Sequence, residues 1–528
     1  MLAPTANFIR SHARLSLLIA SLAIAPCAWL VWAAHSRPRA WAVREVPIAF
    51  WAWQSNAPAQ ADVERALHQT GARTLFMRAG QLDYERGTCR LIRAASGPFP
   101  RGVELHLVYN ATPDLLAAFE TIDIQALVSA IAETYAADSE RAARGRAEVA
   151  GLQLDLDVPT RLLPKYEGLL RMLRERLPEG IKLSITGLPT WMRSLALATV
   201  LEAVDFWVPQ CYGATIPEQL ERATPIASLA AVADAIDGAR GLGRPFYAGL
   251  AAYGYAIHYS PDGRRIQVSG TLDPELVANS TSLELVERRR FGSGENSSSE
   301  WRLVYRAREA CVLGGLFLRE GEWLMLDLPT AESLRAAART VRERAGPRLL
   351  GVCVFRLPSA SDKTTLTIEE VADALLDRPP SVALEVTAKL APLSQSATPG
   401  ERTRVEIACV NTGSTGALCG EDALMVEAQV PAGRLRTIEL NGFGSSETLF
   451  APAGIDGRSD EVVACGVRRA NLVRLMKRTW RPGETAFVVL EFSGEPPDAT
   501  SLTISVRRDE RTAWQETRTV AIERENRW

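Results

Sequence analysis

The sequence predicts a (β/α)8 TIM-type barrel followed by a C-terminal all-β sandwich-like domain, with an N-terminal transmembrane segment. Eight short apolar or alternating runs, most of them separated by helical periodicity, span about 330 residues, which is typical of such a barrel. Beyond Arg378-Pro379-Pro380 the helical signal fades and only strand-like runs remain. The predicted boundaries are 1–40 for a cytoplasmic stub and signal anchor, 41–378 for the barrel and 381–528 for the sandwich-like domain.

The predicted barrel strands share a short length and end in a polar or aromatic cluster. They are Ile48–Trp53, Thr74–Gly80, Glu104–Asn110, Gly151–Pro159, Lys182–Leu188, Val204–Tyr212, Pro245–Tyr253 and Gly351–Leu357. Helical patterns fill most of the gaps, at Ala61–Gln69, Ile124–Arg144, Leu162–Leu177, Leu195–Ala203, Ser228–Ala239, Glu332–Arg344 and Ile368–Asp377.

Two segments depart from this alternation. Between Gln81 and Gly102 no helix is expected, only a hairpin around Arg86-Gly87. An insertion at 255–329 opens with a turn at Pro261-Asp262-Gly263 and contains a polar stretch, Phe291–Glu300. Such an insertion could wall a substrate cleft, or it could have no function.

The C-terminal region reads as strands with Gly, Asn and Pro turns between them. The runs are Val382–Leu390, Arg404–Val410, Leu424–Val430, Arg436–Leu440, Ala486–Phe492 and Leu502–Val506. The domain either binds carbohydrate or braces the barrel. A Cys409–Cys419 disulfide is an open alternative in an oxidising compartment.

Composition excludes several classes of function. With 47 % hydrophobic and 23 % charged residues, the chain has ordinary globular composition. A net charge of −2 offers no basic footprint, so no nucleic-acid partner is expected. The sequence has no Cys/His cluster that predicts a metal site and no Gly-rich phosphate loop, Gly-x-Ser-x-Gly or His-Glu-x-x-His motif. We therefore expect neither a metal nor another cofactor.

The N-terminal apolar segment Leu15–Ala34 contains no charged residue and is long enough to span a bilayer. Arg10, His12 and Arg14 precede it, and the positive-inside rule then exports everything that follows. A signal anchor would hold the main body in the periplasm at the inner membrane, whereas a signal peptide cleaved near Ala33 would release it. The length of the run favours the anchor.

The most informative strand is Gly151–Pro159, which alternates leucines with Gln153, Asp155 and Asp157. Because a barrel strand is covered on both faces, the polar side chains should point into the barrel. A buried, unpaired carboxylate costs several kcal/mol, so these acids are candidates for catalysis. The structural alternative is a buried polar cluster with His106, Ser184 and Thr186 on adjacent strands.

Other candidates lie near predicted strand ends, where barrel active sites form. Predicted substrate-binding residues, besides Gln153, are Gln210, Tyr212, Trp51, Trp53, Trp191 and Tyr253. The aromatic residues could stack on sugar rings or simply belong to the core. Arg78 and Arg356 could pair with the carboxylates, which would keep both acids ionised.

Several barrel segments resemble glycoside hydrolase family 18, the chitinase-type barrels. The fourth strand of that family ends in Gly-x-Asp-x-Asp-x-Glu, and Gly151–Asp157 follows this pattern. The resemblance places Asp157 at the general acid and Asp155 at the Asp that orients the substrate acetamido group. Gln153 stands at the first Asp of the motif.

Three further segments support the same resemblance. Val208–Tyr212 falls where that family has Met-x-Tyr-Asp, with Gln210 and Tyr212 at the Met and Tyr positions. Gly249–Gly254 resembles its seventh-strand Gly-Leu-Pro-x-Tyr-Gly, and Phe355 stands at the usual eighth-strand Trp.

A closer resemblance is to the bacterial domain-of-unknown-function family 3142. Its signature reads like Gln153-Leu-Asp155-x-Asp157-x-Pro159-Thr160, followed by a helix Tyr, here Tyr166. Its fifth strand reads like Leu183–Trp191. This resemblance covers the barrel.

The resulting hypothesis is an extracytoplasmic, glycoside hydrolase-like protein that acts on a cell-envelope polysaccharide by general acid catalysis through Asp157, with Asp155 as electrostatic partner. The alternative is a catalytically inactive glycan-binding or envelope scaffold protein on the same barrel.

Overall fold

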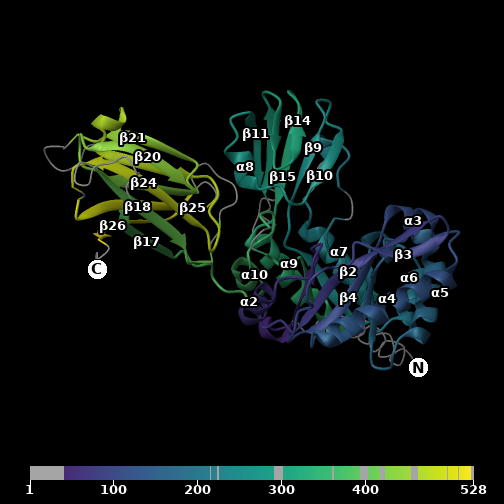
Figure 1. Cartoon of the computed structure of the whole chain (residues 1–528). Helices are drawn as coiled ribbons and strands as arrows, with labels where there is room; N and C mark the ends of the chain where they lie inside the picture. Colours follow the sequence, from purple (N-terminus) through teal and green to yellow (C-terminus); the bar gives the residue numbers. More distant parts are fainter. Residues whose placement is uncertain are drawn as a thin grey trace, which may run out of the picture.

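The computed structural model describes residues 41–524 apart from 214–215, 223–224, 291–300, 360–361, 393–401, 415, 417–422, 453–461, 496 and 509–510. Figure 1 shows a barrel, a smaller sheet above it and a β-rich domain beside them. Three predicted features fall outside the described residues: the Leu15–Ala34 segment, the Phe291–Glu300 stretch and Cys419.

The barrel is closed and its eight strands run parallel. They are β1 (Ile48–Ala52), β2 (Thr74–Glu85), β4 (Glu104–Ala111), β5 (Val149–Asp155), β6 (Lys182–Gly187), β7 (Phe206–Pro209), β8 (Phe246–Ala251) and β16 (Leu349–Phe355). Strand β1 pairs with both β2 and β16, and Ile48 lies opposite Val352. This closure confirms the predicted architecture.

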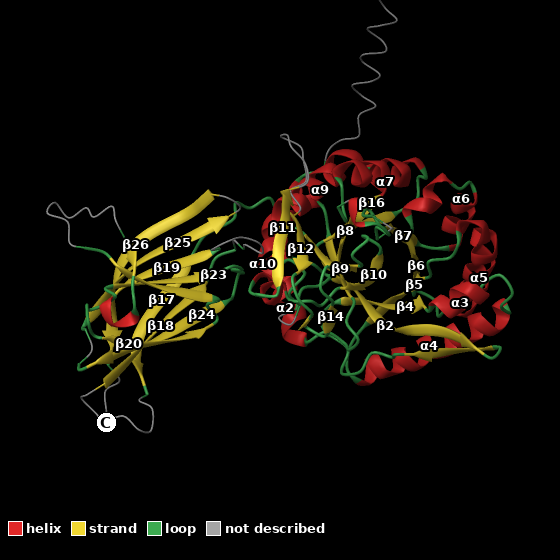
Figure 2. Cartoon of the chain, turned by 90° about the horizontal axis from the view of Figure 1, so that it is seen from above, coloured by secondary structure: helices red, strands yellow, loops and turns green. Residues whose placement is uncertain are grey.

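Helices surround the barrel, as Figure 2 shows from above. They are α2 (Gln60–Thr70), α3 (Pro113–Ala118), α4 (Ile124–Arg144), α5 (Leu163–Arg176), α6 (Ala196–Val200), α7 (Leu229–Gly241), α9 (Ala331–Arg344) and α10 (Ile368–Leu375). The three leucines of the β5 segment, Leu152, Leu154 and Leu156, are 0 % exposed and join the helices in one core. Burial of each leucine contributes roughly 1.5–3 kcal/mol, so the polar residues between them are left to face the barrel interior.

The second βα unit has no helix, as predicted. Strand β2 turns at Arg86 and Gly87 and returns as β3 (Thr88–Ile92). Both turn residues have positive φ, at 52° and 83°, as a two-residue hairpin with the twist of the flanking strands requires. A loop without a helix then leads from β3 to β4.

The lower barrel interior is aromatic and holds one buried histidine. His106 is 2 % exposed, and its ring centroid lies 4.8 Å from that of Phe76. Burial lowers its pKa to about 4, so the ring is neutral at physiological pH. A Cβ atom on Gly151 of the neighbouring strand would lie 2.2 Å from His106 Nδ1, which explains the glycine. His106 is thus a core residue.

The insertion after β8 forms its own antiparallel sheet, which the sequence patterns did not reveal. Its five strands, in spatial order, are β10 (Arg265–Ser269), β9 (Tyr255–Tyr259), β15 (Trp323–Leu328), β12 (Trp301–Ala307) and β11 (Leu283–Arg290). The helix α8 (Pro274–Ala278) and the hairpin of β13 (Cys311–Leu313) and β14 (Leu316–Leu318) complete it.

The C-terminal domain is β-rich, as predicted. Its strands, in spatial order, are β20 (Leu435–Asn441), β24 (Thr485–Ser493), β18 (Arg402–Asn411), β17 (Leu384–Ala391), β26 (Arg511–Glu523), β25 (Ala499–Arg508), β19 (Leu424–Gln429), β23 (Leu472–Lys477), β21 (Ser445–Phe450) and β22 (Val463–Ala464). Side chains from both halves of this sheet share one hydrophobic core. One pair, β17 with β26, is parallel, whereas the other strand pairs of this domain are antiparallel.

Cys409 lies buried on β18, whereas its proposed disulfide partner is outside the described residues. No helix within the described part of the chain is both long and apolar enough to cross a membrane.

Candidate functional site

A cavity of about 180 Å³ opens at the carboxyl ends of the barrel strands. It is lined by Trp51, Trp53, Asp155, Thr186, Gln210, Tyr212, Tyr253 and Phe355. Six of the eight strands supply these residues, either from their last positions or from the segment that follows. This is the face on which barrel enzymes build their sites. The cavity is smaller than the roughly 300–1,000 Å³ of pockets that enclose drug-sized ligands.

Asp155 is the last residue of β5 and the carboxylate in this cavity. Its Oδ1 accepts a hydrogen bond from the Thr186 hydroxyl at 2.6 Å. Burial, reinforced by the nearby charge of Asp157, raises the Asp155 pKa to about 7, while Thr186 and Arg78 act in the opposite direction. Near neutral pH this carboxyl group can therefore exist in either protonation state.

Asp157 lies two residues further along the chain, beyond the end of β5, and its side chain is exposed. It does not line the cavity, so we place it at the rim. Partial desolvation raises its pKa above the usual range. The backbone that follows Asp157 is fixed by a hydrogen bond at 2.9 Å, which Trp191 Nε1 donates to the Val158 carbonyl.

Neither aspartate is locked by an arginine. Arg78 Nε donates to Asn110 Oδ1 at 3.0 Å, and Arg356 pairs with Asp362 at 2.6 Å. Within the described part of the chain, no ion pair joins Asp155 or Asp157 to an arginine. Pairing with Arg356, which the sequence left open, is therefore wrong. Arg78 acts on Asp155 only through its charge.

Gln153 lies one position below Asp155 on the inward face of β5 and is 0 % exposed. It accepts a hydrogen bond from Trp51 Nε1 at 2.7 Å and donates one to the Ser184 hydroxyl at 3.3 Å. Gln153 therefore orients the Trp51 ring at the cavity floor but does not line the cavity itself.

An aromatic wall stands opposite the carboxylate, with Phe355 at its centre. The Phe355 ring lies 5.0 Å from Tyr253, 5.6 Å from Trp53 and 5.9 Å from Trp51, centroid to centroid. Tyr212 contacts Tyr253 at 6.0 Å. Residues of the insertion, among them Ile257 and Met325, share a hydrophobic cluster with these rings. The insertion thus supports this wall of the cavity.

The structure brings together five of the seven predicted substrate-binding residues: Trp51, Trp53, Gln210, Tyr212 and Tyr253. Trp191 lies apart from them, 1 % exposed, with its ring 6.0 Å from Tyr166 in the helical layer. Two cavity residues, Thr186 and Phe355, were not among the predicted site residues. The sequence could have identified both residues. Thr186 is a polar residue on the strand next to Asp155, and Phe355 stands at the position of the eighth-strand Trp of family 18.

Among the described residues, no three His, Cys, Asp or Glu side chains gather as a metal-binding group.

The domain is a closed parallel (β/α)8 barrel that carries a carboxyl group, that of Asp155, at the end of its fourth strand. Residues 116–285 match the model of the family described as domain of unknown function DUF3142, which confirms the resemblance over that range. A comparison with curated proteins found no match.

Similar solved structures include the spore cortex-lytic enzyme SleL of Bacillus cereus, with 15 % identity, a TM-score of 0.42, and coverage of 63 % of this chain and 74 % of that one. A chitinase from Chromobacterium violaceum has 16 % identity and a TM-score of 0.43, with coverage of 62 % and 99 %. The chitinase-like agglutinin of Robinia pseudoacacia has 15 % identity and a TM-score of 0.41, with coverage of 62 % and 99 %. None of these similarities by itself assigns an activity to this chain.

Proposed function

We propose that this protein is a glycoside hydrolase-like protein that acts on a cell-envelope polysaccharide, with Asp157 as general acid and Asp155 as its electrostatic partner. One observation carries the proposal. A carboxyl group with a raised pKa faces an aromatic wall in a cavity at the catalytic end of a barrel, and a second carboxyl group stands at the rim.

The geometry suggests how a glycan would be cleaved. A sugar ring in the cavity would lie against the half-buried rings of Trp53 and Tyr253, with its linkage oxygen at the mouth. Asp157 would donate a proton to that oxygen as the bond to the anomeric carbon breaks, and water would then add to the anomeric carbon and release a proton that restores the acid. Ionised Asp155 would stabilise the positive charge that develops on the ring.

The electrostatics of the pair decide where its proton lies. Desolvation raises the pKa of both carboxyl groups, and the charge of Asp157 raises that of Asp155 further, so the pair tends to keep one proton near neutral pH. Asp155, whose pKa is raised to about 7, holds this proton in the resting protein. General acid catalysis would require the proton to pass to Asp157, and the hydrogen bond from Thr186 would then stabilise ionised Asp155.

The second candidate is a glycan-binding protein without hydrolytic activity. The residue type at position 157 favours it, because Asp157 stands where the family 18 motif has Glu, and its side chain is one methylene shorter than that of the usual general acid. The aromatic wall would serve a binding protein equally well.

The two candidates differ in one assay. A fragment beginning near Ala40 is incubated with envelope polysaccharides, including poly-N-acetylglucosamine, and release of reducing ends is measured. Hydrolysis supports the enzyme. Retention of the fragment on immobilised glycan without any hydrolysis supports the binding protein. A fragment that neither cleaves nor binds any glycan contradicts both.

We also propose that the segment Leu15–Ala34 anchors the protein in the inner membrane and that the barrel works in the periplasm. The charge-free run and the arginines before it support this proposal.

A further inference from the structure

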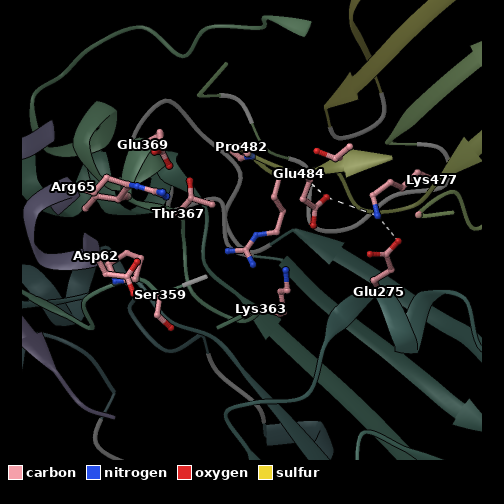
Figure 3. Close-up of a pocket in the computed structure, with 16 residues that line it drawn as sticks. Asp62, Arg65, Glu275, Ser359, Lys363, Thr367, Glu369, Lys477, Pro482 and Glu484 are labelled. Carbon is pink, nitrogen blue, oxygen red and sulfur yellow. Dashed lines mark hydrogen bonds and ion pairs between the residues drawn. The ribbon is translucent and has the colours of Figure 1, made fainter. Parts of the chain in front are cut away.

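A second and larger cavity, of about 580 Å³, lies where the three parts of the molecule meet. The barrel contributes α2, the segment that follows β16 and the start of α10. The insertion contributes α8, and the C-terminal domain contributes the loop between β23 and β24. Figure 3 shows this junction cleft with Arg65 and Lys363 extending into it.

Basic side chains of the C-terminal domain hold the cleft in shape. Lys477, whose side chain is 4 % exposed, binds Glu275 of α8 and lies 3.8 Å from Glu484 (Figure 3). Arg481 donates to the carbonyls of Asp362, at 3.0 Å, and Thr365. These bonds connect the C-terminal domain to both the insertion and the barrel, so the cleft is preformed.

Two cationic groups in the cleft have unused hydrogen-bonding capacity. Arg65 and Lys363 have neither an ion pair nor a side-chain hydrogen bond within the described part of the chain. Arg481 adds a third positive charge to the lining, but its terminal nitrogens donate to barrel carbonyls and its Nε is buried. Two free cationic groups beside a third positive charge suit an oxyanion.

The remaining chemistry of the cleft narrows the kind of ligand. Asp62 and Glu369 offer acceptors for hydroxyl groups, and no aromatic ring occurs among the described lining residues. A nucleobase would therefore find no stacking partner. The volume of about 580 Å³ exceeds what a single small oxyanion fills. A polymer that carries many hydroxyl groups and also negative charges matches both the side chains of the lining and the volume of the cleft.

The junction cleft is also linked to the site cavity by the chain itself. Phe355 lines the cavity and Lys363 lines the cleft, a few residues later in the same segment. Tyr253 of the cavity pairs through its backbone with Thr365, whose carbonyl binds Arg481 of the cleft. The segment that follows β16 therefore connects the two hollows through the chain.

We propose that the junction cleft binds an anionic segment of a glycan through its carboxylate or phosphate groups. The proposal rests on the proposed function only in that the ligand is a glycan, and it does not require hydrolysis. Arg65 and Lys363 pair with the anionic groups, the charge of Arg481 adds to the attraction, and Asp62 and Glu369 accept hydrogen bonds from hydroxyls.

The test measures equilibrium binding to the full chain in detergent by calorimetry. The probes are oligogalacturonate for carboxylates, poly(glycerol phosphate) for phosphates, inorganic phosphate and a neutral chito-oligosaccharide. We expect one or both anionic polymers to bind, with affinity that falls as salt rises. The double variant Arg65→Gln, Lys363→Gln should weaken that binding about tenfold or more. Preference between the two polymers identifies the anionic group.

The matched control is Arg86→Gln, which removes a side chain that is 92 % exposed at the β2–β3 turn and should leave binding unchanged. The proposal is overturned if no anionic polymer binds, if the double variant binds as well as the wild type, or if inorganic phosphate binds as tightly as the polymer. It is also overturned if the double variant weakens binding of the neutral probe as much as binding of the polymer, whereas neutral-probe binding that the double variant leaves unchanged belongs to the barrel cavity. If the wild-type protein binds an anionic polymer but hydrolyses no glycan, only the proposed hydrolytic function is contradicted, and the proposal for the junction cleft stands.

Discussion

Asp155 and Asp157 lie on one chain segment but in different environments. Asp155 is the last residue of β5, lines the cavity and accepts a hydrogen bond from Thr186. Asp157 lies beyond the strand end and its side chain is exposed. The difference in environment is what allows two identical side chains to take different roles.

The first prediction concerns the proton at the rim. If the protein hydrolyses a glycan, Asp157→Asn should lower the rate by about 10²–10⁴-fold, because asparagine keeps the shape and loses the proton. Asp155→Asn should also impair turnover, through lost charge stabilisation. The measurement is release of reducing ends under saturating substrate.

Asp498→Asn is the matched control, since the Asp498 side chain is 94 % exposed in the C-terminal domain. It should retain full activity. An Asp157→Asn variant as active as the control would mean that the general acid lies on another strand.

The second prediction concerns stability and pH. The folded protein raises the Asp155 pKa from 3.8 to about 7, so it binds this proton more tightly than the unfolded chain does. The resulting stabilisation is complete below the unfolded pKa and is lost as pH rises through the folded one. The Asp155→Asn variant has no titrating group at this position, so this contribution to its stability does not change with pH. Relative to the wild type, the variant should therefore be more stable at about pH 8 than at about pH 5.

Thermal unfolding of the barrel at the two pH values measures this difference. Other buried acids, such as Asp327, titrate equally in both proteins and cancel in the comparison. An unchanged difference in melting temperature between the two pH values would show that Asp155 has an ordinary pKa.

At the scale of elements, strand β5 fits its neighbours closely. Its leucines meet the helices, its polar residues bind β6 through Ser184 and Thr186, and Gly151 leaves room for His106 on β4. Interior packing at this density tolerates little added volume. The position of the two carboxyl groups therefore depends on contacts at the opposite end of the strand.

The third prediction tests this fit. Gly151→Ala should destabilise the barrel by about 1–3 kcal/mol, because the new methyl group meets His106 and the Lys182 carbonyl. The double variant with His106→Ala should recover part of the loss, which denaturant unfolding would reveal as a coupling energy.

Gly168→Ala on α5 is the control, since nothing lies within 4 Å of its added Cβ. It should stabilise by about 0.5–1 kcal/mol through helix propensity. If Gly151→Ala behaved like this control, the packing argument for β5 would fail.

At the scale of the whole molecule, the C-terminal domain docks on both the barrel and the insertion. Lys477 reaches α8 and Arg481 reaches the segment after β16. Because the same contacts shape the junction cleft, bracing and ligand binding are compatible roles for this domain. The insertion in turn supports the aromatic wall of the site. The insertion and the C-terminal domain thus both contact the segments that follow the carboxyl ends of the barrel strands.

The fourth prediction concerns where the molecule works. A fusion of Met1–Ala40 to a reporter that is active only in the periplasm should give signal and sediment with membranes, because Leu15–Ala34 is long and uncharged. A soluble, active reporter would indicate a cleaved signal peptide. An inactive reporter would contradict the orientation. Replacing Arg10 and Arg14 with glutamate is a control that should weaken the orientation signal.

The sequence by itself determined the barrel, its closure, the helix-free second unit and the face of β5 that carries Gln153 and Asp155. These features follow from local periodicity, because the alternation of leucine with polar residues and the Arg86-Gly87 turn act over a few neighbours. Asp157 was expected on the same inward face, but the strand ends at Asp155 and the Asp157 side chain is exposed. The antiparallel sheet of the insertion was not predicted, since its short strands lie among turns and are paired across long separations.

Only the tertiary structure decided which side chains meet. Trp191 and Trp53 both stand near strand ends, yet one turns into the helical layer and the other into the cavity. That choice depends on partners far away in the chain, such as the Val158 carbonyl for Trp191 and the Phe355 ring for Trp53. The junction cleft is the extreme case. It joins Arg65 to Arg481, and no local pattern records how separate domains dock.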